Sequence, residues 1–216
     1  HLIIGDLGTG QSVLAMKGGS IQCREIFLGK NNGTSGVLLQ KNGDITKQGQ
    51  LDTRIGGGVP GNHGSWGAWR ITGGTLQDSW NLQIGAYGTG LMEVDGGDVK
   101  VVGFLSIGRY ADDRDHPSHG MLDVKSGNVT STQTNNYVLV GEEGVGVLNI
   151  RGGTFTCVNK LMIGAGAIDK PGDGTVNLLT GGTLVTCGIT QMNESEATGR
   201  LWWNGGTLKA GAASSS

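Results

Sequence analysis

Residues Gly88–Gly97 read GTGLMEVDGG, and residues Gly144–Gly153 read GVGVLNIRGG. In both segments apolar side chains alternate with polar or small ones before a pair of glycines closes the run. Alternation with a period of two is the pattern of a β-strand, because successive side chains point to opposite faces. Glycine pairs are suited to tight turns. Each segment therefore predicts one strand followed by a corner.

A second motif, of the form L-x-I-G, precedes these segments and recurs along the chain. Its clear copies are Leu2–Gly5, Ile26–Gly29, Leu82–Gly85, Leu105–Gly108, Val138–Gly141 and Leu161–Gly164, and its degenerate copies are Thr53–Gly56 and Thr190–Asn193. The eight repeats that these motifs begin cover essentially all of the 216 residues. A single copy cannot bury its apolar face alone, so the copies must stack as coils of a solenoid.

The sequence thus predicts an all-β fold, a single-stranded parallel β-helix that forms one domain over residues 1–216. We expect about eight three-faced coils and a right-handed path, which is the hand of parallel β crossovers. Equivalent residues should stack inside the rod: Ile4, Ile84, Ile107, Val140 and Ile163 in one row, and Phe155, Leu184 and Leu208 in another. The other side chains expected to point inward are Cys23, Trp69, Ile71, Cys157, Leu201 and Trp203.

Composition excludes several classes of function. Glycine contributes 43 residues, about three times its ordinary share, but there are only three prolines, so the chain is not collagen-like. The formal net charge is −2 and no basic run exists, which argues against nucleic-acid binding. No apolar stretch approaches the roughly 18 residues of a transmembrane helix. Cys23, Cys157 and Cys187 form an odd set without a CxxC pair, which argues against a disulfide scaffold or a zinc site.

The pattern G-x-G-x-L-x-V-x-G-G-T-L, clearest in the two segments quoted first, resembles the β-strand repeats of autotransporter passengers and related large bacterial surface proteins. The resemblance covers nearly the whole chain. It implies an extracellular or bacterial cell-surface location, where such a β-helix serves as a stalk. Pectate-lyase-like enzymes share this fold as well, and a fold alone does not give a function.

Three of the loops that follow L-x-I-G are long, namely 57–65, 109–119 and 165–173, and they should line one edge of the rod because they leave the same corner. The fifth-coil loop is rich in acidic residues and histidine: Asp112, Asp113, Asp115, His116 and His119. Its carboxylates are suitable ligands for Ca²⁺, and its histidines for a transition metal. The spacing matches no known metal signature, so a solvated polar loop is the alternative, and we expect no other cofactor.

Glu93 and Asp123 occupy the same outward strand position in neighbouring coils, followed by Asn149 in the next. Glycosidases use two carboxyl groups about 5–9.5 Å apart, and stacked strands lie about 4.8 Å apart, so this pair is the catalytic candidate. No ladder of arginines accompanies it, and no nucleophile triad, P-loop or dinucleotide motif is found. The sequence therefore favours a protein that is not an enzyme.

Aromatic residues outside the core are candidates for binding sugar, because flat rings stack on sugar faces: Trp66, Trp80, Tyr87, Tyr110, Tyr137 and Trp202. The alternative is that these rings only anchor loops. The favoured function is an extracellular structural or adhesive rod, and the alternative is a β-helix that binds or cleaves polysaccharide. The expected partner is a polysaccharide or a cell-surface glycan.

The two ends of the chain also predict self-association. The chain opens on the strand Leu2–Ile4 without a covering cap, and the segment Gly205–Leu208 would join Leu2–Gly5 in the register of neighbouring coils. Uncapped solenoid ends expose unpaired backbone groups. We therefore expect either one stretch of a longer β-helix or a subunit that stacks end to end.

Overall fold

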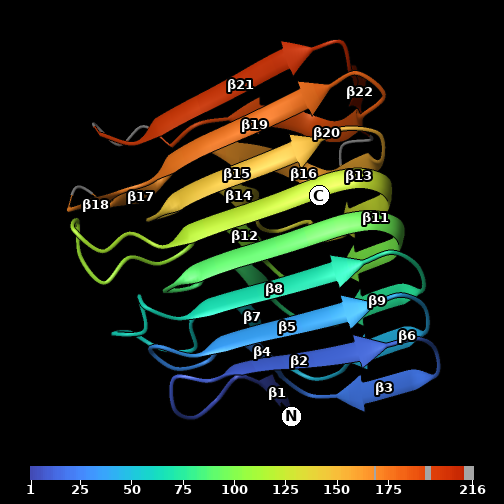
Figure 1. Ribbon diagram of the computed structural model, residues 1–216. Coiled ribbons are helices and arrows are strands. Elements are labelled where there is room, and N and C mark those ends of the chain that lie inside the picture. Colours follow the sequence, from blue (N-terminus) through green and yellow to red (C-terminus); the bar gives the residue numbers. More distant parts are fainter. Residues whose placement is uncertain (168, 193–195, 212–216) are drawn as a thin grey trace.

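The computed structural model describes residues 1–167, 169–192 and 196–211. Within these ranges the regular structure is entirely β, and the strands of the solenoid pair in parallel as stacked coils (Figure 1). The β-helix of about eight coils predicted from the repeat is confirmed. None of the described segments is a helix of the length and apolar character that a membrane span requires.

Each coil contributes a short strand, a long strand and a third strand, and each kind forms its own parallel ladder. The short strands are β1 (Leu2–Ile4), β4 (Ile26–Leu28), β7 (Thr53–Ile55), β10 (Leu82–Ile84), β12 (Leu105–Ile107), β14 (Val138–Val140), the end of β16 (Thr154–Ile163) and the end of β20 (Thr183–Thr190). The long strands are β2 (Gln11–Met16), β5 (Ser35–Gln40), β8 (Trp66–Ile71), β11 (Thr89–Val101), β13 (His119–Ser131), β15 (Val145–Ile150), β19 (Asp173–Leu179) and β21 (Thr198–Asn204).

The third ladder completes each coil. It contains β3 (Ser20–Cys23), β6 (Asp44–Lys47), β9 (Thr75–Asp78), the ends of β11 and β13, the start of β16, β20 (Thr183–Thr190) and β22 (Thr207–Ala210). The seventh-coil loop adds a small antiparallel hairpin of β17 (Gly166–Ala167) and β18 (Lys170–Pro171).

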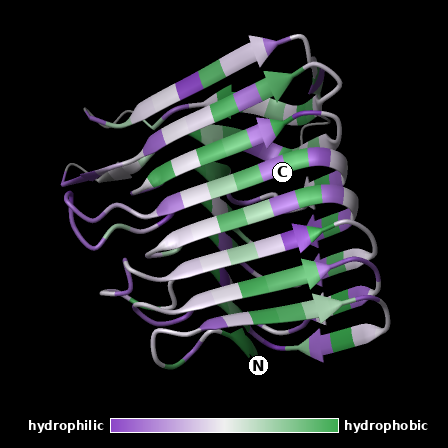
Figure 2. Cartoon of the chain, in the orientation of Figure 1, coloured by the Kyte–Doolittle hydropathy of each residue, from purple (hydrophilic) through white to green (hydrophobic). Residues whose placement is uncertain are grey.

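The core lies inside the coils, where equivalent apolar side chains stack in rows. One row follows the short strands and contains the five predicted residues, Ile4, Ile84, Ile107, Val140 and Ile163, together with Leu28 and Ile55, all buried. The row of Phe155, Leu184 and Leu208 also forms as predicted. Along the strands, hydrophobic segments alternate with polar ones (Figure 2).

Cys23 and Cys157 are buried, as predicted, and all three cysteines are free thiols. Burial raises the pKa of Cys157 to about 11, so this thiol stays protonated at neutral pH and is unreactive.

The glycine of the L-x-I-G motif makes the tight corner between the short and long strands. Gly56 has φ +76°, and a Cβ placed there would lie 2.0 Å from the carbonyl oxygen of Thr89 in the next coil. A glycine at the start of the long strand packs against this corner. A Cβ on Gly67 would lie 2.2 Å from the carbonyl oxygen of Leu28 and 2.5 Å from the backbone nitrogen of Gly56. Two glycine rows thus allow the backbones of successive coils to meet at this corner.

Two predictions about the last coil were wrong. Leu201 and Trp203 pair with the buried Val176 and Leu178 in the inward register, yet they are 37% and 59% exposed. Because no described strand lies beyond β21 in the ladder, only one side of these residues is covered. In addition, Leu161 pairs with Ile189 and not with Thr190, and Asn193, the last residue of that motif copy, lies outside the described residues.

Candidate functional site

A groove runs along the outer face of the short strands in coils four to seven. Leu139 and Met162 lie on its floor. They are the outward-pointing middle residues of their short strands and continue the register row of Gln83 and Ser106 in coils four and five. These side chains point away from the core, yet they are at most 8% exposed. Loops on both sides of the short strands therefore rise above the floor and form the walls.

Two adjoining hollows of about 340 and 360 Å³ make up the groove, and they share Phe104 and Asn136. The first is polar and is also lined by Trp80, Asn81, Gly103, Arg109 and Gln133. The second is more apolar and is also lined by Tyr137, Leu139, Glu142, Glu143, Met162, Ala165, Gly166 and Met192. The walls thus combine aromatic rings, side-chain amides and charged groups.

Arg109 organises the wall between the two hollows. Its guanidinium lies 4.3 Å from the ring centre of Phe104 and 4.5 Å from that of Tyr110, and Tyr110 stacks on Tyr87 at 4.7 Å. Cation–π and stacking contacts of this kind hold planar groups in a fixed orientation. Burial raises the pKa of both tyrosines, which therefore stay neutral hydrogen-bond donors at physiological pH.

Glu142 is the most perturbed carboxyl group of the groove. Its Oε2 accepts a hydrogen bond from Ser106 Oγ at 3.1 Å and lies 3.2 Å from Arg109 Nε. Burial raises its pKa, Arg109 and Ser106 oppose this effect, and the charge of Glu143 adds to it. A largely buried carboxyl group with a charged partner in a cleft is a feature of ligand-binding and catalytic sites.

This pKa predicts a pH effect on stability. Because the pKa of Glu142 is higher in the folded than in the unfolded chain, the native state keeps a proton that the unfolded state has lost. The contribution of Glu142 therefore falls as pH rises from its unfolded to its folded pKa. We expect Glu142→Gln to flatten this fall, measured by urea unfolding between about pH 4 and pH 8. Equal pH profiles of the variant and the wild type would contradict the expectation.

The predicted catalytic pair lies on a different face, that of the long strands. Glu93 and Asp123 are neighbours in register, as expected, with Asn149 next. Basic residues lie beside both carboxylates: Glu93 is 2.8 Å from Arg70 and 2.7 Å from Lys125. Asp123 likewise lies 2.7 Å from Arg151 Nε.

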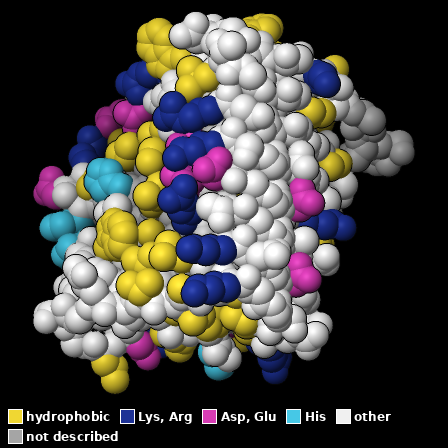
Figure 3. All heavy atoms as spheres, turned by 45° about the vertical axis from the view of Figure 1, so that its right-hand side comes forward, with side chains coloured by type: hydrophobic (Ala, Val, Ile, Leu, Met, Phe, Trp, Pro, Cys, Tyr) yellow, Lys and Arg dark blue, Asp and Glu magenta, His cyan; other side chains and the backbone are white. Residues whose placement is uncertain are grey.

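Arg70, Lys125 and Arg151 lie toward or just after the ends of the straight parts of their long strands, and Figure 3 shows Lys and Arg side chains, in dark blue, arranged in a column along the molecule. The column neutralises both carboxylates. Because each carboxylate is held in an ion pair with a residue of another coil, this face is better explained as an ion-pair network between coils.

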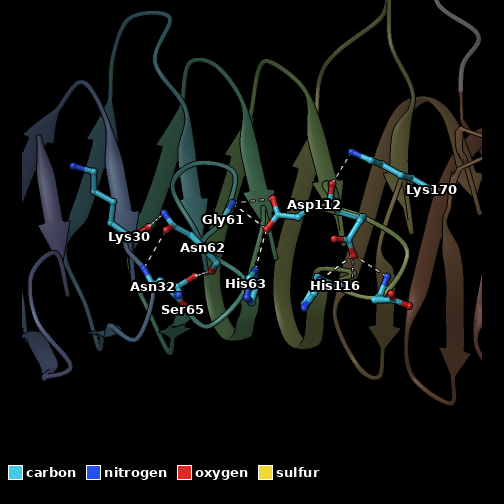
Figure 4. A network of polar contacts seen from close by, with 12 residues as sticks. Lys30, Asn32, Gly61, Asn62, His63, Ser65, Asp112, His116 and Lys170 are labelled. Carbon is cyan, nitrogen blue, oxygen red and sulfur yellow. Dashed lines mark hydrogen bonds and ion pairs between the residues drawn. The ribbon is translucent and has the colours of Figure 1, made fainter.

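The long loops meet along one edge of the rod, as predicted (Figure 4). Asp112 of the fifth-coil loop accepts the backbone N–H of Gly61 at 2.9 Å and contacts His63 Nδ1 at 3.1 Å, both in the third-coil loop. Lys170 of the seventh-coil loop donates to the carbonyl of Ala111 at 3.0 Å. These contacts tie the three loops to one another across non-adjacent coils.

This network does not fit a calcium or transition-metal site. Asp112 is directed to the third-coil loop, whereas Asp113 accepts hydrogen bonds from the backbone of Asp115 and His116 within its own loop. A further contact with the His116 ring lowers the pKa of Asp113. His119 lies on the long strand β13. In the described ranges no three His, Cys, Asp or Glu side chains are placed to share a metal ion.

The structure separates the aromatic candidates into two groups. Trp80 and Tyr137 line the groove, and Tyr110 and Tyr87 stack behind Arg109 in its wall. Trp66 and Trp202 lie on the long-strand face, 38% and 61% exposed.

The sequence placed Glu142 only as a carboxylate near the possible calcium loop, and it assigned no role to Arg109. A signal existed, because each directly follows the glycine of an L-x-I-G motif, and the N–H of Glu142 bonds to the carbonyl of Gly108 in the preceding coil. Residues at this repeat position therefore stack at the rim of the groove.

No protein-family model, no curated protein and no solved structure matches this chain. Its function has to be argued from the chemistry of the groove.

Proposed function

We propose that this chain is an extracellular β-helical rod that attaches to a polysaccharide strand through the groove on its short-strand face. The observation that supports it is the groove itself, which continues across several coils parallel to the rod axis. Coils repeat every ~4.8 Å, so equivalent side chains recur along the axis and can hold a chain polymer at successive units. The resemblance to surface-protein repeats agrees with this role.

The lining suits a sugar chain better than other polymers. Trp80, Phe104 and Tyr137 offer apolar ring surface, while Asn81, Gln133 and Asn136 offer paired donors and acceptors for hydroxyl groups. Acidic and basic groups are both present, which disfavours a strongly anionic polymer such as a nucleic acid. We infer binding without cleavage, because Glu142, the groove carboxyl group whose pKa is raised, is already paired with Arg109.

Trp80→Ala is expected to weaken binding of the best ligand from a polysaccharide panel about tenfold, because stacking on an aromatic ring contributes roughly 1 kcal/mol or more. Affinity electrophoresis followed by calorimetry measures the change. The matched control is Trp202→Ala, which removes a more exposed tryptophan from another face and should keep the affinity within about twofold.

If Trp202→Ala weakens binding as much as Trp80→Ala does, the ligand contacts the long-strand face as well, and the groove is not its specific site. Absence of binding to every neutral, acidic and amino-sugar polymer in the panel would reject the proposal. Release of reducing ends or unsaturated sugars that Glu142→Gln abolishes would change the assignment to an enzyme.

We also propose end-to-end contact between coils as a second role of this chain. The supporting observation is the exposure of Leu201 and Trp203, which stand at positions that are fully buried in the preceding coil. Another β-coil placed on β21 would cover them and continue the ladder, a contact that need not close. Light scattering of the wild type and of Trp203→Ala tests this. Filaments with an axial repeat near ~40 Å would support it, and a wild-type monomer would reject self-stacking.

A further inference from the structure

A lysine and an aspartate face each other inside the solenoid, away from the groove. Lys47 on β6 and Asp78 on β9 are direct register partners in neighbouring coils (Figure 1). Neither side chain has exposed surface, and Lys47 Nζ lies 3.1 Å from Asp78 Oδ1. Charged side chains are almost never buried to this extent, and taking both ions out of water is costly.

The polar groups around this pair are incompletely satisfied. Asp78 Oδ1 also accepts the backbone N–H of Trp80 at 2.9 Å, but Oδ2 has no hydrogen-bond partner. The hydroxyl of Thr53 lies close enough to the carboxyl group to lower its pKa, but it does not reach the geometry of a regular hydrogen bond. The only other contact of the lysine amine that we find in the described residues is the carbonyl of Gly49 at 3.5 Å.

An apolar site favours the uncharged form of such a pair. Burial raises the pKa of Asp78, although Thr53 and Lys47 oppose the shift. Transfer of one proton from the ammonium to the carboxylate removes both charges and leaves a nucleophilic amine beside a carboxylic acid. The 3.1 Å contact joins Nζ to Oδ1, so the amine is held beside the carboxyl group whose Cγ it would attack.

We propose that Lys47 and Asp78 condense to an amide bond that links the second and third coils covalently. After the proton transfer, Nζ attacks Cγ and forms the new N–C bond. The bond from Cγ to Oδ2 breaks, and Oδ2 leaves as water with the transferred proton and one further proton from Nζ. Oδ1 remains as the amide oxygen, and the nitrogen keeps one hydrogen. No oxidant or other reactant is needed.

The neighbouring groups have matching roles. The N–H of Trp80 already points at Oδ1 and would stabilise the negative charge that develops there in the tetrahedral intermediate. The unpaired hydroxyl of Thr53 is available to pass protons to the departing Oδ2. The product contains no buried charge, so it removes the desolvation cost of the ion pair.

Intact-mass spectrometry of the full chain under denaturing conditions tests the bond. The expected mass is that of the sequence minus one water molecule. Proteolysis should yield one branched peptide that joins the segments of Lys47 and Asp78. Lys47→Arg should show the full sequence mass, whereas Lys41→Arg, which changes an exposed lysine of the same coil, should keep the deficit.

Two results would overturn the proposal. One is a wild-type chain with the full sequence mass. The other is a deficit of one water molecule without the branched peptide, since an aspartate can also lose water by cyclising onto its own backbone. The wild-type measurement decides the question even if Lys47→Arg fails to fold, and it is independent of any polysaccharide binding.

Discussion

Gly56→Ala is expected to destabilise the solenoid by about 3 to 5 kcal/mol. The left-handed φ of +76° alone costs a non-glycine residue roughly 1–2 kcal/mol. The added Cβ would also lie 2.0 Å from the carbonyl oxygen of Thr89 and 2.3 Å from its carbonyl carbon. These are backbone atoms of the next coil, which cannot rotate away, so overpacking adds to the loss. Urea unfolding followed by far-UV circular dichroism measures it.

Two other glycines separate these contributions. Gly8 has φ +76° as well, but no atom lies within 4 Å of its hypothetical Cβ, so Gly8→Ala should cost only about 1–2 kcal/mol. Gly18 has neither a left-handed φ nor a close neighbour, so Gly18→Ala should change stability by less than about 0.5 kcal/mol. Similar losses for Gly8→Ala and Gly56→Ala would show that the coils do not meet closely at Gly56.

The architecture could be predicted because every feature that specifies it is local and repeated. Alternation gives the strands, and the glycines of L-x-I-G give the corners. Stacking then follows from the repeat, since a coil that cannot bury its own face must place equivalent residues on one another. The buried row from Ile4 to Ile163 required no information beyond this register.

The groove was harder to predict because it depends on contacts between repeats. Arg109 and Glu142 belong to different coils, and each looks like an ordinary loop residue by itself. The loops also differ in length from coil to coil, so their conformation is not repeated. The contact of His63 with Asp112 joins the third and fifth coils and has no counterpart in the sequence pattern.

The inward position of Lys47 in the buried pair was not predicted, for a different reason. Lys47 lies two residues after Ile45, as Cys23 lies two residues after Ile21, and the two positions are in register. The periodicity that places Cys23 inside therefore also places Lys47 inside. The general preference of lysine for the surface conceals this, and only the facing Asp78 makes the position tolerable.

Trp69→Ala is expected to destabilise the chain by about 3–5 kcal/mol. Trp69 is fully buried in β8, so its removal loses the burial of a large ring and leaves a cavity in a row of stacked side chains. Its Nε1 also donates to Oε1 of the buried Gln40 at 3.2 Å, and this acceptor would be left unpaired. Urea unfolding at constant pH measures the free energy of unfolding.

Trp203→Ala is the matched comparison, because Trp203 also occupies an inward position of a long strand. With 59% of its surface exposed, its truncation should cost less than about 1 kcal/mol, including the bond from Nε1 to the carbonyl of Gly206. The sequence assigned both tryptophans to the core, and the difference arises only because Trp69 has a coil on each side. Equal losses for the two variants at a concentration where the protein is monomeric would contradict the exposed position of Trp203. Equal losses that appear only at high concentration would show that another copy covers this residue.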